Sequence, residues 1–131
     1  CVYPPGTTGG SLHGQNHTPF SPAHGRCISD QVNVAWALQD EAPGFGDNSG
    51  GFLCVPGSHK AAYPIPEPHT TSIDMPDVYK PPLQAGDVLM FGAVAHGTTA
   101  WRSKRQRRTV IQFMGSGNVA LAPGKKPVGW R

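Results

Sequence analysis

The stretch GGFLCVPGSHK, residues 50–60, starts with two glycines, continues through four apolar residues and breaks at a Pro-Gly pair. A short apolar run bounded by turn residues is typical of a core β-strand, whereas a helix needs ten or more residues. The stretch ends on His59, which stands between a serine and a lysine. It therefore predicts a strand over residues 52–55, a tight turn after it, and a polar side chain whose role depends on the rest of the chain.

Three further segments have the pattern of short strands separated by turns. Residues 33–39, NVAWALQ, alternate large apolar side chains with smaller or polar ones, as a strand with two unlike faces does. Residues 88–91, VLMF, follow a Gly-Asp turn signal, and residues 108–116, RTVIQFMGS, form the last apolar run. The 17 glycines and 14 prolines interrupt these runs and form no tracts, and no segment has a capped helical stripe. The sequence thus predicts one all-β domain over residues 1–131, either a β-sandwich, a jelly roll or an open barrel.

Two long segments lack a strand pattern. Residues 1–26 have the composition of loops, and residues 61–82 form a proline-rich insert with almost no periodicity. Structureless inserts of this length are usually functional or disordered, so a substrate loop or lid is expected at 61–82. Because the chain begins with Cys1 and its first dozen residues are typical of the middle of a protein, we expect a fragment, a processed chain or the C-terminal part of a longer domain.

The charge distribution argues against a nucleic-acid partner. The net charge is +3, and much of it comes from the run RSKRQRR, residues 102–108. A nucleic-acid-binding domain usually has a broader basic face with interleaved aromatic residues. We therefore expect Arg102, Lys104 and Arg105 at the solvated tip of a hairpin.

Apolar runs, the N-terminal pattern and the cysteines bear on where in the cell the protein is expected. No run approaches the ~18 apolar residues of a membrane span, so no membrane partner is expected. The chain also lacks a basic start followed by an apolar centre, the pattern of a signal peptide. The three cysteines are widely spaced without a CxxC pair, which predicts reduced thiols and a cytoplasmic location.

His96 is the histidine whose surroundings most suggest chemistry. It follows the apolar strand and a short GAVA linker, and it precedes Arg107 and Arg108 by 11 and 12 residues. A histidine on one strand and an arginine near the start of the next antiparallel strand can project into the same cavity. There a neutral imidazole binds a metal, and a guanidinium forks onto the carboxylate of a bound acid.

The segments NVAWALQDEAPGFGDNSGGFLCVPGSHK, AGDVLMF and AHGTTAWRSKRQRRTVIQF, in this order, resemble the phytanoyl-CoA dioxygenase family of iron(II)/2-oxoglutarate oxygenases over residues 12–114. The resemblance implies a double-stranded β-helix, a cupin-like jelly-roll barrel, with iron at one open end held by two histidines and a carboxylate. It also implies 2-oxoglutarate as cosubstrate, O₂ as oxidant, and hydroxylation of an aliphatic C–H bond in a small organic or acyl substrate. The oligomeric state is not readable from the sequence.

Carried over residue by residue, the resemblance implies that His96 is the distal iron ligand. The arginine that pairs with the far carboxylate of 2-oxoglutarate matches Arg108 or Arg107, with Arg108 preferred because the strand continues from it. Thr98 matches a serine or threonine near the same carboxylate. Trp36 matches a strand tryptophan that helps to wall the cosubstrate.

The resemblance also implies that His59 is not a metal ligand. The family's PGSHK box ends a core strand and forms a tight turn close to the mouth of the site. His59 is then expected to stabilise the turn, and His59 and Ser58 are the candidates for contacts on the substrate side.

The family writes its first ligand pair as His-x-Asp, and here the sequence departs from the pattern. His13 is the preferred match and His17 the alternative, but neither has a carboxylate two residues on. Gln15 would be at most a weak ligand, and Asp30 would have to supply a carboxylate from elsewhere in the fold. A halogenase-like variant, in which a halide replaces the carboxylate, is another reading. So is a non-catalytic jelly-roll binding module, or a structural component, that has lost the full metal triad.

Overall fold

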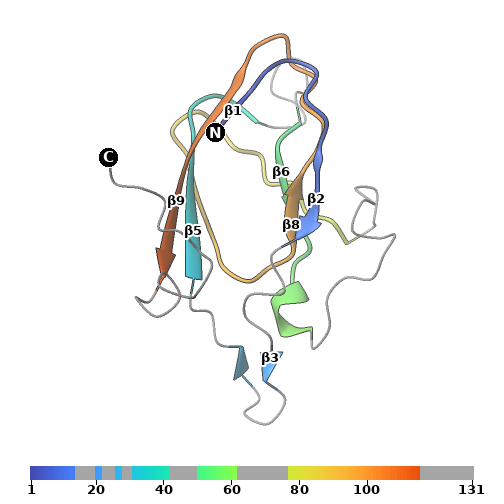
Figure 1. Cartoon of the computed structure of the whole chain (residues 1–131), viewed down its shortest axis with the longest axis vertical. Coiled ribbons are helices and arrows are strands. Elements are labelled where there is room, and N and C mark those ends of the chain that lie inside the picture. The colour runs from blue at the N-terminus through green and yellow to red at the C-terminus, as the bar shows by residue number, and fades with distance from the viewer. Residues whose placement is uncertain (14–19, 22–25, 28–30, 42–49, 62–76, 116–131) are drawn as a thin grey trace, which may run out of the picture.

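The computed structural model describes residues 1–13, 20–21, 26–27, 31–41, 50–61 and 77–115 (Figure 1). The described elements are short strands and one turn of 3₁₀ helix, in agreement with the all-β prediction. In chain order they are β1 Val2–Tyr3, β2 Gly10–His13, β3 Phe20–Ser21, β4 Arg26–Cys27, β5 Gln31–Ala37, β6 Phe52–Cys54, η3 Ser58–Lys60, β7 Val88–Phe91, β8 His96–Thr98 and β9 Arg107–Gly115.

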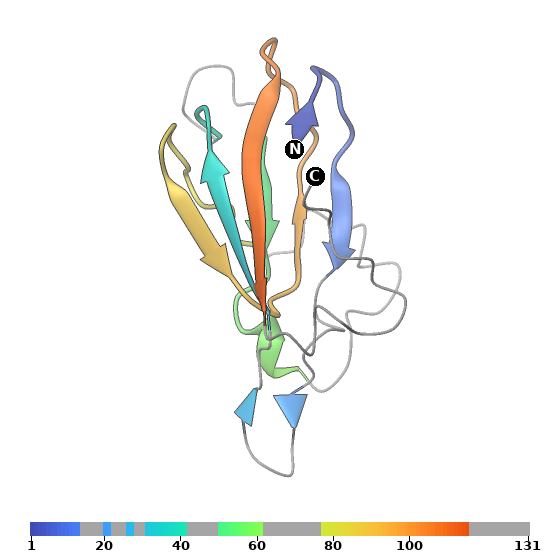
Figure 2. The same ribbon diagram turned by 60° about the vertical axis from the view of Figure 1, so that its left-hand side comes forward.

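The two larger sheets form separate layers that face each other (Figures 1 and 2). One sheet has four strands in the order β1-β9-β5-β7, and the other has three in the order β2-β8-β6. All the pairings are antiparallel, and β3 pairs with β4 as a small separate ribbon. The longest register runs between β5 and β9, from Gln31 opposite Gly115 to Ala37 opposite Thr109. The β5–β9 pair is therefore the backbone of the larger layer.

The four apolar runs of the sequence became strands close to the expected bounds. The run at 88–91 matches β7, and the runs at 52–55 and 108–116 differ from β6 and β9 by one residue. The expectation of loops throughout residues 1–26 was wrong, because β1 and β2 lie there. The strand β2 has the sequence GSLH, with no apolar alternation, and it is extended because it pairs with β8. Such strands depend on a distant partner and leave little local signal.

The two faces of β5 differ in side-chain size. Asn33, Ala35 and Ala37 face the opposing layer, where all three line the space between the sheets. Because alternate residues of a strand point to opposite faces, Val34 and Trp36 belong to the outer face. These small inward side chains leave part of the space between the two sheets unfilled, so the fold has a hollow there.

Part of the outer face of the larger sheet is apolar and exposed, although Val34 on the same face is buried. Met90 is 67% exposed, and Val88 and Val110, which lie opposite Trp36 on either side, are also exposed. Among the described residues, no helix has the length and apolarity that a membrane span requires.

Candidate functional site

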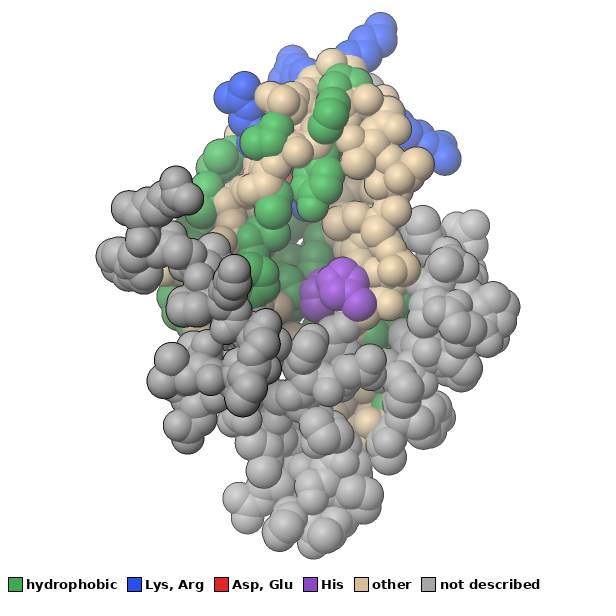
Figure 3. Space-filling view, viewed as in Figure 1, with side chains coloured by type: hydrophobic (Ala, Val, Ile, Leu, Met, Phe, Trp, Pro, Cys, Tyr) green, Lys and Arg blue, Asp and Glu red, His purple; other side chains and the backbone are tan. Residues whose placement is uncertain are grey.

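A cavity of about 280 Å³ lies between the two sheets. Figure 3 shows histidine side chains at the lower margin of a hollow lined by hydrophobic side chains. The cavity is lined by inward residues of both layers, among them His13, His96, Arg107 and Glu41. Its volume is at the small end of the range for ligand pockets, so it suits a small organic molecule.

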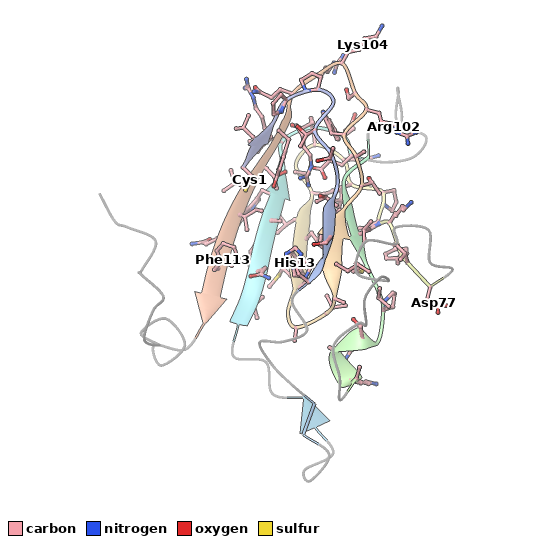
Figure 4. All side chains as sticks on the ribbon, turned by 45° about the vertical axis from the view of Figure 1, so that its right-hand side comes forward. Cys1, His13, Asp77, Arg102, Lys104 and Phe113 are labelled. Carbon is pink, nitrogen blue, oxygen red and sulfur yellow. The ribbon has the colours of Figure 1, made fainter. Side chains whose placement is uncertain are left out.

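The two histidines meet because their strands pair directly. His13 ends β2, His96 begins β8, and the two residues are opposite each other in the antiparallel register. Their ring centroids are 4.4 Å apart with an interplanar angle of 51°. Directly opposite residues share a face of the sheet, so both imidazoles point into the cavity. Figure 4 shows His13 at the end of β2, with Lys104 at the far end of the molecule.

Gly97 lets these two strands come close. A Cβ atom at this position would lie 2.7 Å from the carbonyl oxygen of Gly10 and 3.0 Å from that of Ser11. Both contacts are with the backbone of β2, which cannot turn away as a side chain could. The histidine pair therefore requires glycine between His96 and Thr98.

Both imidazoles have one nitrogen fixed by a backbone carbonyl two residues earlier in the chain. The Nδ1 atom of His13 is 2.8 Å from the carbonyl oxygen of Ser11, and that of His96 is 2.8 Å from the carbonyl oxygen of Val94. A carbonyl oxygen can only accept, so each Nδ1 carries the hydrogen and donates it. The Nε2 atom of each neutral ring then keeps its lone pair, which is the state that binds a metal.

The surroundings of His96 favour its neutral form. Its ring lies edge-on to Phe91 at 4.5 Å between centroids and stacks against Phe52 at 5.9 Å. Burial lowers the pKa of His96, and the neighbouring His13 lowers it further, while the hydrogen bond to Val94 acts in the opposite direction. His96 is therefore ready to act as a ligand near neutral pH.

The residues at this end fit a divalent transition metal with two protein nitrogens. Imidazole suits iron, nickel and zinc. In the described part of the chain, no group of three or more His, Cys, Asp or Glu side chains is arranged to hold a metal. The other ligand candidates, His17, Gln15 and Asp30, lie outside the described residues.

The opposite end of the cavity holds a buried ion pair. Arg107 Nη2 donates to Glu41 Oε2 over 2.8 Å, and the Thr109 hydroxyl donates to Glu41 Oε1 over 3.1 Å. Glu41 is 2% exposed and Arg107 6% exposed. The guanidinium also lies 5.2 Å from the ring centroid of Tyr3, a cation–π distance. Arg107 is thus held by two neighbours, Glu41 after β5 and Tyr3 in β1.

The preference for Arg108 over Arg107 is not supported by the position of the two side chains. Arg108 is exposed and donates through Nε and Nη2 to the Gln106 side chain, at 3.2 and 3.1 Å. Arg107 lines the cavity and Arg108 does not. The reason is strand periodicity, since adjacent residues of β9 point to opposite faces and only one of them can face the other layer.

Trp36 also lies away from the expected place. It is half-buried on the outer face of β5, opposite Val88 and Val110, and does not line the cavity. It therefore cannot wall a ligand held inside. Thr98 does line the cavity, and its hydroxyl accepts a hydrogen bond of 2.9 Å from the Gly10 amide.

Ser58 and His59 lie in η3, outside the residues that line the cavity. The Ser58 hydroxyl is buried and accepts a hydrogen bond of 2.8 Å from the amide of Ala95. Ala95 is followed directly by His96. Ser58 therefore supports the backbone of a candidate ligand, and no contact with a substrate is needed to explain its burial.

The basic run at 102–108 divides between surface and interior. Arg102, Lys104 and Arg105 are exposed, as expected for a hairpin tip, and Arg102 and Lys104 lie far from His13 in Figure 4. The insert at 61–82 falls largely outside the described residues, so its role as a lid stays a prediction.

Glu41 and Thr109 were missed by the reasoning from sequence. Glu41 lies in the stretch DEAPGFGDNSGG, whose glycines, proline and charged residues are typical of a polar loop. In the structure, Gly51 allows the close approach of Glu41, but the sequence does not show this pairing. A Cβ atom at Gly51, whose φ is +140°, would lie 2.8 Å from Glu41 Oε2. No local pattern connects residues 41 and 107.

One protein family matches most of the chain. The family described as phytanoyl-CoA dioxygenase (PhyH) matches residues 2–109. No protein with a curated description matches the chain.

Several solved structures share the fold at low sequence identity. Apo HygX from Streptomyces hygroscopicus has a TM-score of 0.68 at 21% identity, covering 87% of this chain and 54% of HygX. HygX with nickel and 2-oxoglutarate bound has a TM-score of 0.66 at 21% identity, covering 88% of this chain and 53% of that one. SnoN, a non-heme alpha ketoglutarate dependent epimerase from nogalamycin biosynthesis, has a TM-score of 0.55 at 22% identity, covering 99% of this chain and 54% of SnoN. The jelly-roll class is thereby confirmed, and the chain spans about half the length of these neighbours.

Proposed function

Because the chain belongs to the phytanoyl-CoA dioxygenase (PhyH) family, we propose that it forms the metal- and cosubstrate-binding part of an iron(II)- and 2-oxoglutarate-dependent dioxygenase. One observation carries the proposal. The rings of His13 and His96 meet 4.4 Å apart in a cavity, each with Nδ1 donating to a backbone carbonyl and Nε2 left for a metal. This shared tautomer is the one in which the second ring nitrogen of each residue can bind a metal.

In this proposal His13 and His96 hold the iron, and Arg107 with Thr98 faces the far end of 2-oxoglutarate. Bound iron with 2-oxoglutarate and O₂ supplies oxidation of an unreactive C–H bond. The protein supplies orientation and exclusion of water. Phe52 and Phe91 pack 4.9 Å apart beside His96 and keep that side of the ring dry.

The mouth of the cavity bears on the substrate class. Phe113 lines the cavity yet is 63% exposed, and Leu89 and Ile111 line the same wall. These side chains favour a small organic or acyl substrate with an apolar part at the reacting carbon. We take hydroxylation as the default reaction. The structural neighbour SnoN is an epimerase, so proteins of this fold also catalyse other reactions.

The test is a titration of anaerobically purified protein with Fe(II) and 2-oxoglutarate. A visible absorption band that needs both components, together with O₂-dependent release of succinate, is expected. His96→Ala should abolish the band, and His59→Ala should leave it unchanged. A protein that binds no metal, or a band insensitive to His96→Ala, would contradict the proposal.

A non-catalytic jelly-roll binding module is the second candidate. It is favoured by the ion pair itself, because Glu41 already engages the guanidinium that a cosubstrate would use. A binding module would bind metal or acid without releasing succinate in the same titration. A halogenase-like variant differs again, since its iron band would shift on addition of chloride.

A further inference from the structure

The carboxylate of Glu41 has the contacts that a ligand carboxylate would make. Its two oxygens each accept one hydrogen bond, Oε2 from the guanidinium of Arg107 and Oε1 from the hydroxyl of Thr109. A guanidinium and a hydroxyl that converge on one carboxylate make a typical anion site inside a protein. Here the chain fills that site with its own side chain.

The surrounding structure is built to admit Glu41. Gly51 has φ +140°, a conformation that favours glycine, and a Cβ there would lie 2.8 Å from Oε2 and 3.0 Å from Cβ of Glu41. The backbone of Glu41 is also held, because its amide donates to the carbonyl of Leu83 over 2.8 Å. Glu41 therefore occupies this position as part of the fold.

Arg107 nevertheless keeps donor capacity. Its Nε–H is buried without a hydrogen-bond partner among the described residues, and Arg107 lines the cavity together with Glu41. An unpaired buried donor is costly, and a ligand oxygen could satisfy it. However, a second carboxylate placed at this guanidinium would lie beside that of Glu41, where like charges repel strongly because little water screens them.

We propose that Glu41 determines the specificity of the site as an internal carboxylate that competes with the far carboxylate of a 2-oxo acid for Arg107. The inference rests on the proposed function, because it concerns the same cavity. Its consequence is that the far carboxylate of 2-oxoglutarate adds little affinity in the native protein. The site then accepts 2-oxo acids with an uncharged tail almost as well.

The first experiment uses the native chain loaded anaerobically with Fe(II). Calorimetry compares 2-oxoglutarate with 2-oxopentanoate, which has the same chain length without the far carboxylate. A free guanidinium would favour the dicarboxylate by ~10- to 150-fold, the usual gain from a hydrogen bond to a charged group. We expect a preference below ~10-fold. A larger preference overturns the inference.

The second experiment removes the competing charge. Glu41→Gln keeps an acceptor for Arg107 and should tighten binding of 2-oxoglutarate by ~10-fold or more while leaving 2-oxopentanoate unchanged. Asp40→Asn is the matched control, because Asp40 is the neighbouring exposed carboxylate and accepts only the Ala85 amide in the described contacts. It should change neither affinity.

The outcomes separate the inference from the function on which it rests. If the native protein binds 2-oxoglutarate and Glu41→Gln binds it no more tightly, the inference alone is overturned. If neither acid binds the native protein or Glu41→Gln, both the inference and the proposed function are overturned. The comparison of the two acids on the native chain decides the matter even where Glu41→Gln does not fold.

Discussion

The polar groups at the two ends of the cavity differ in whether a side chain of the protein already pairs with them. At one end His13 and His96 line the cavity, and each donates from Nδ1 to a backbone carbonyl of its own segment. At the other end Arg107 is engaged by the carboxylate of Glu41, which Thr109 also contacts. The histidine end thus leaves a second nitrogen on each ring that a ligand could use, whereas the arginine end is already paired within the described residues.

This difference suggests different roles for the two ends, with the histidines binding a metal and the ion pair affecting which ligands are accepted. Two imidazoles that line the cavity can bind a metal at little cost to the fold. A buried ion pair, by contrast, must be disturbed before a ligand can use either partner. We therefore expect changes at the arginine end to affect stability first, and changes at the histidine end to affect metal binding first.

The largest effect is expected for Arg107→Met. It leaves the Glu41 carboxylate buried without its cation, and breaking a buried pair in this way typically costs ~3–5 kcal/mol in the free energy of unfolding. Arg108→Met is the matched control, since the exposed side chain of Arg108 should contribute within about 0.5 kcal/mol. Urea unfolding measures both. Equal losses for the two variants would show that the ion pair does not stabilise the fold.

At the other end, His96→Ala should lower the affinity for Fe(II) or Ni(II) by at least ~100-fold, since losing a ligand costs more than losing the hydrogen bond that supports one. His59→Ala, in the 3₁₀ turn outside the cavity, is the control and should stay within about twofold of the native protein. Isothermal titration with the metal distinguishes them. A comparable loss in both variants would remove His96 from the site.

Gly97→Ala tests whether the two histidines need their close strand pairing. The added Cβ meets the backbone of Gly10 and Ser11, and overpacking of this kind costs ~1–3 kcal/mol. Metal affinity should fall with it, because β2 must move away from β8. Gly10→Ala is the milder control, since its Cβ would meet only the Thr98 hydroxyl at 3.2 Å. Unchanged metal affinity in Gly97→Ala would show that metal binding does not depend on the close approach of β2 and β8.

The smallest expected effect is a pH dependence that comes from His96. Burial lowers its pKa in the folded protein, so below the ordinary histidine pKa of about 6.5 the unfolded chain takes up a proton that the folded chain does not. The free energy of unfolding should therefore fall between about pH 7.5 and about pH 5.5. His96→Gln should reduce this slope, as followed by urea unfolding at each pH. A slope as steep as that of the native protein would assign the pH dependence to other groups.

The sequence by itself determined the all-β class and the segments of the longest strands, because alternation and turn residues are local signals. Through the family resemblance it also named His96 as the distal ligand and His13 as the preferred match to the first ligand, although the His-x-Asp pattern is incomplete there. Neither short strand β1 nor β2 was visible, since each is extended only by pairing with a distant strand.

Only the tertiary structure shows that Arg107 and not Arg108 lines the cavity, because neighbouring residues of a strand face opposite ways and the sequence does not say which face meets the second sheet. The same holds for Trp36, which the register of β5 directs to the outer face. Glu41 depended on tertiary structure entirely. Its contact with Arg107 spans 66 residues of sequence, and a polar residue in a loop becomes a buried partner only when the packing of two sheets brings the charges together.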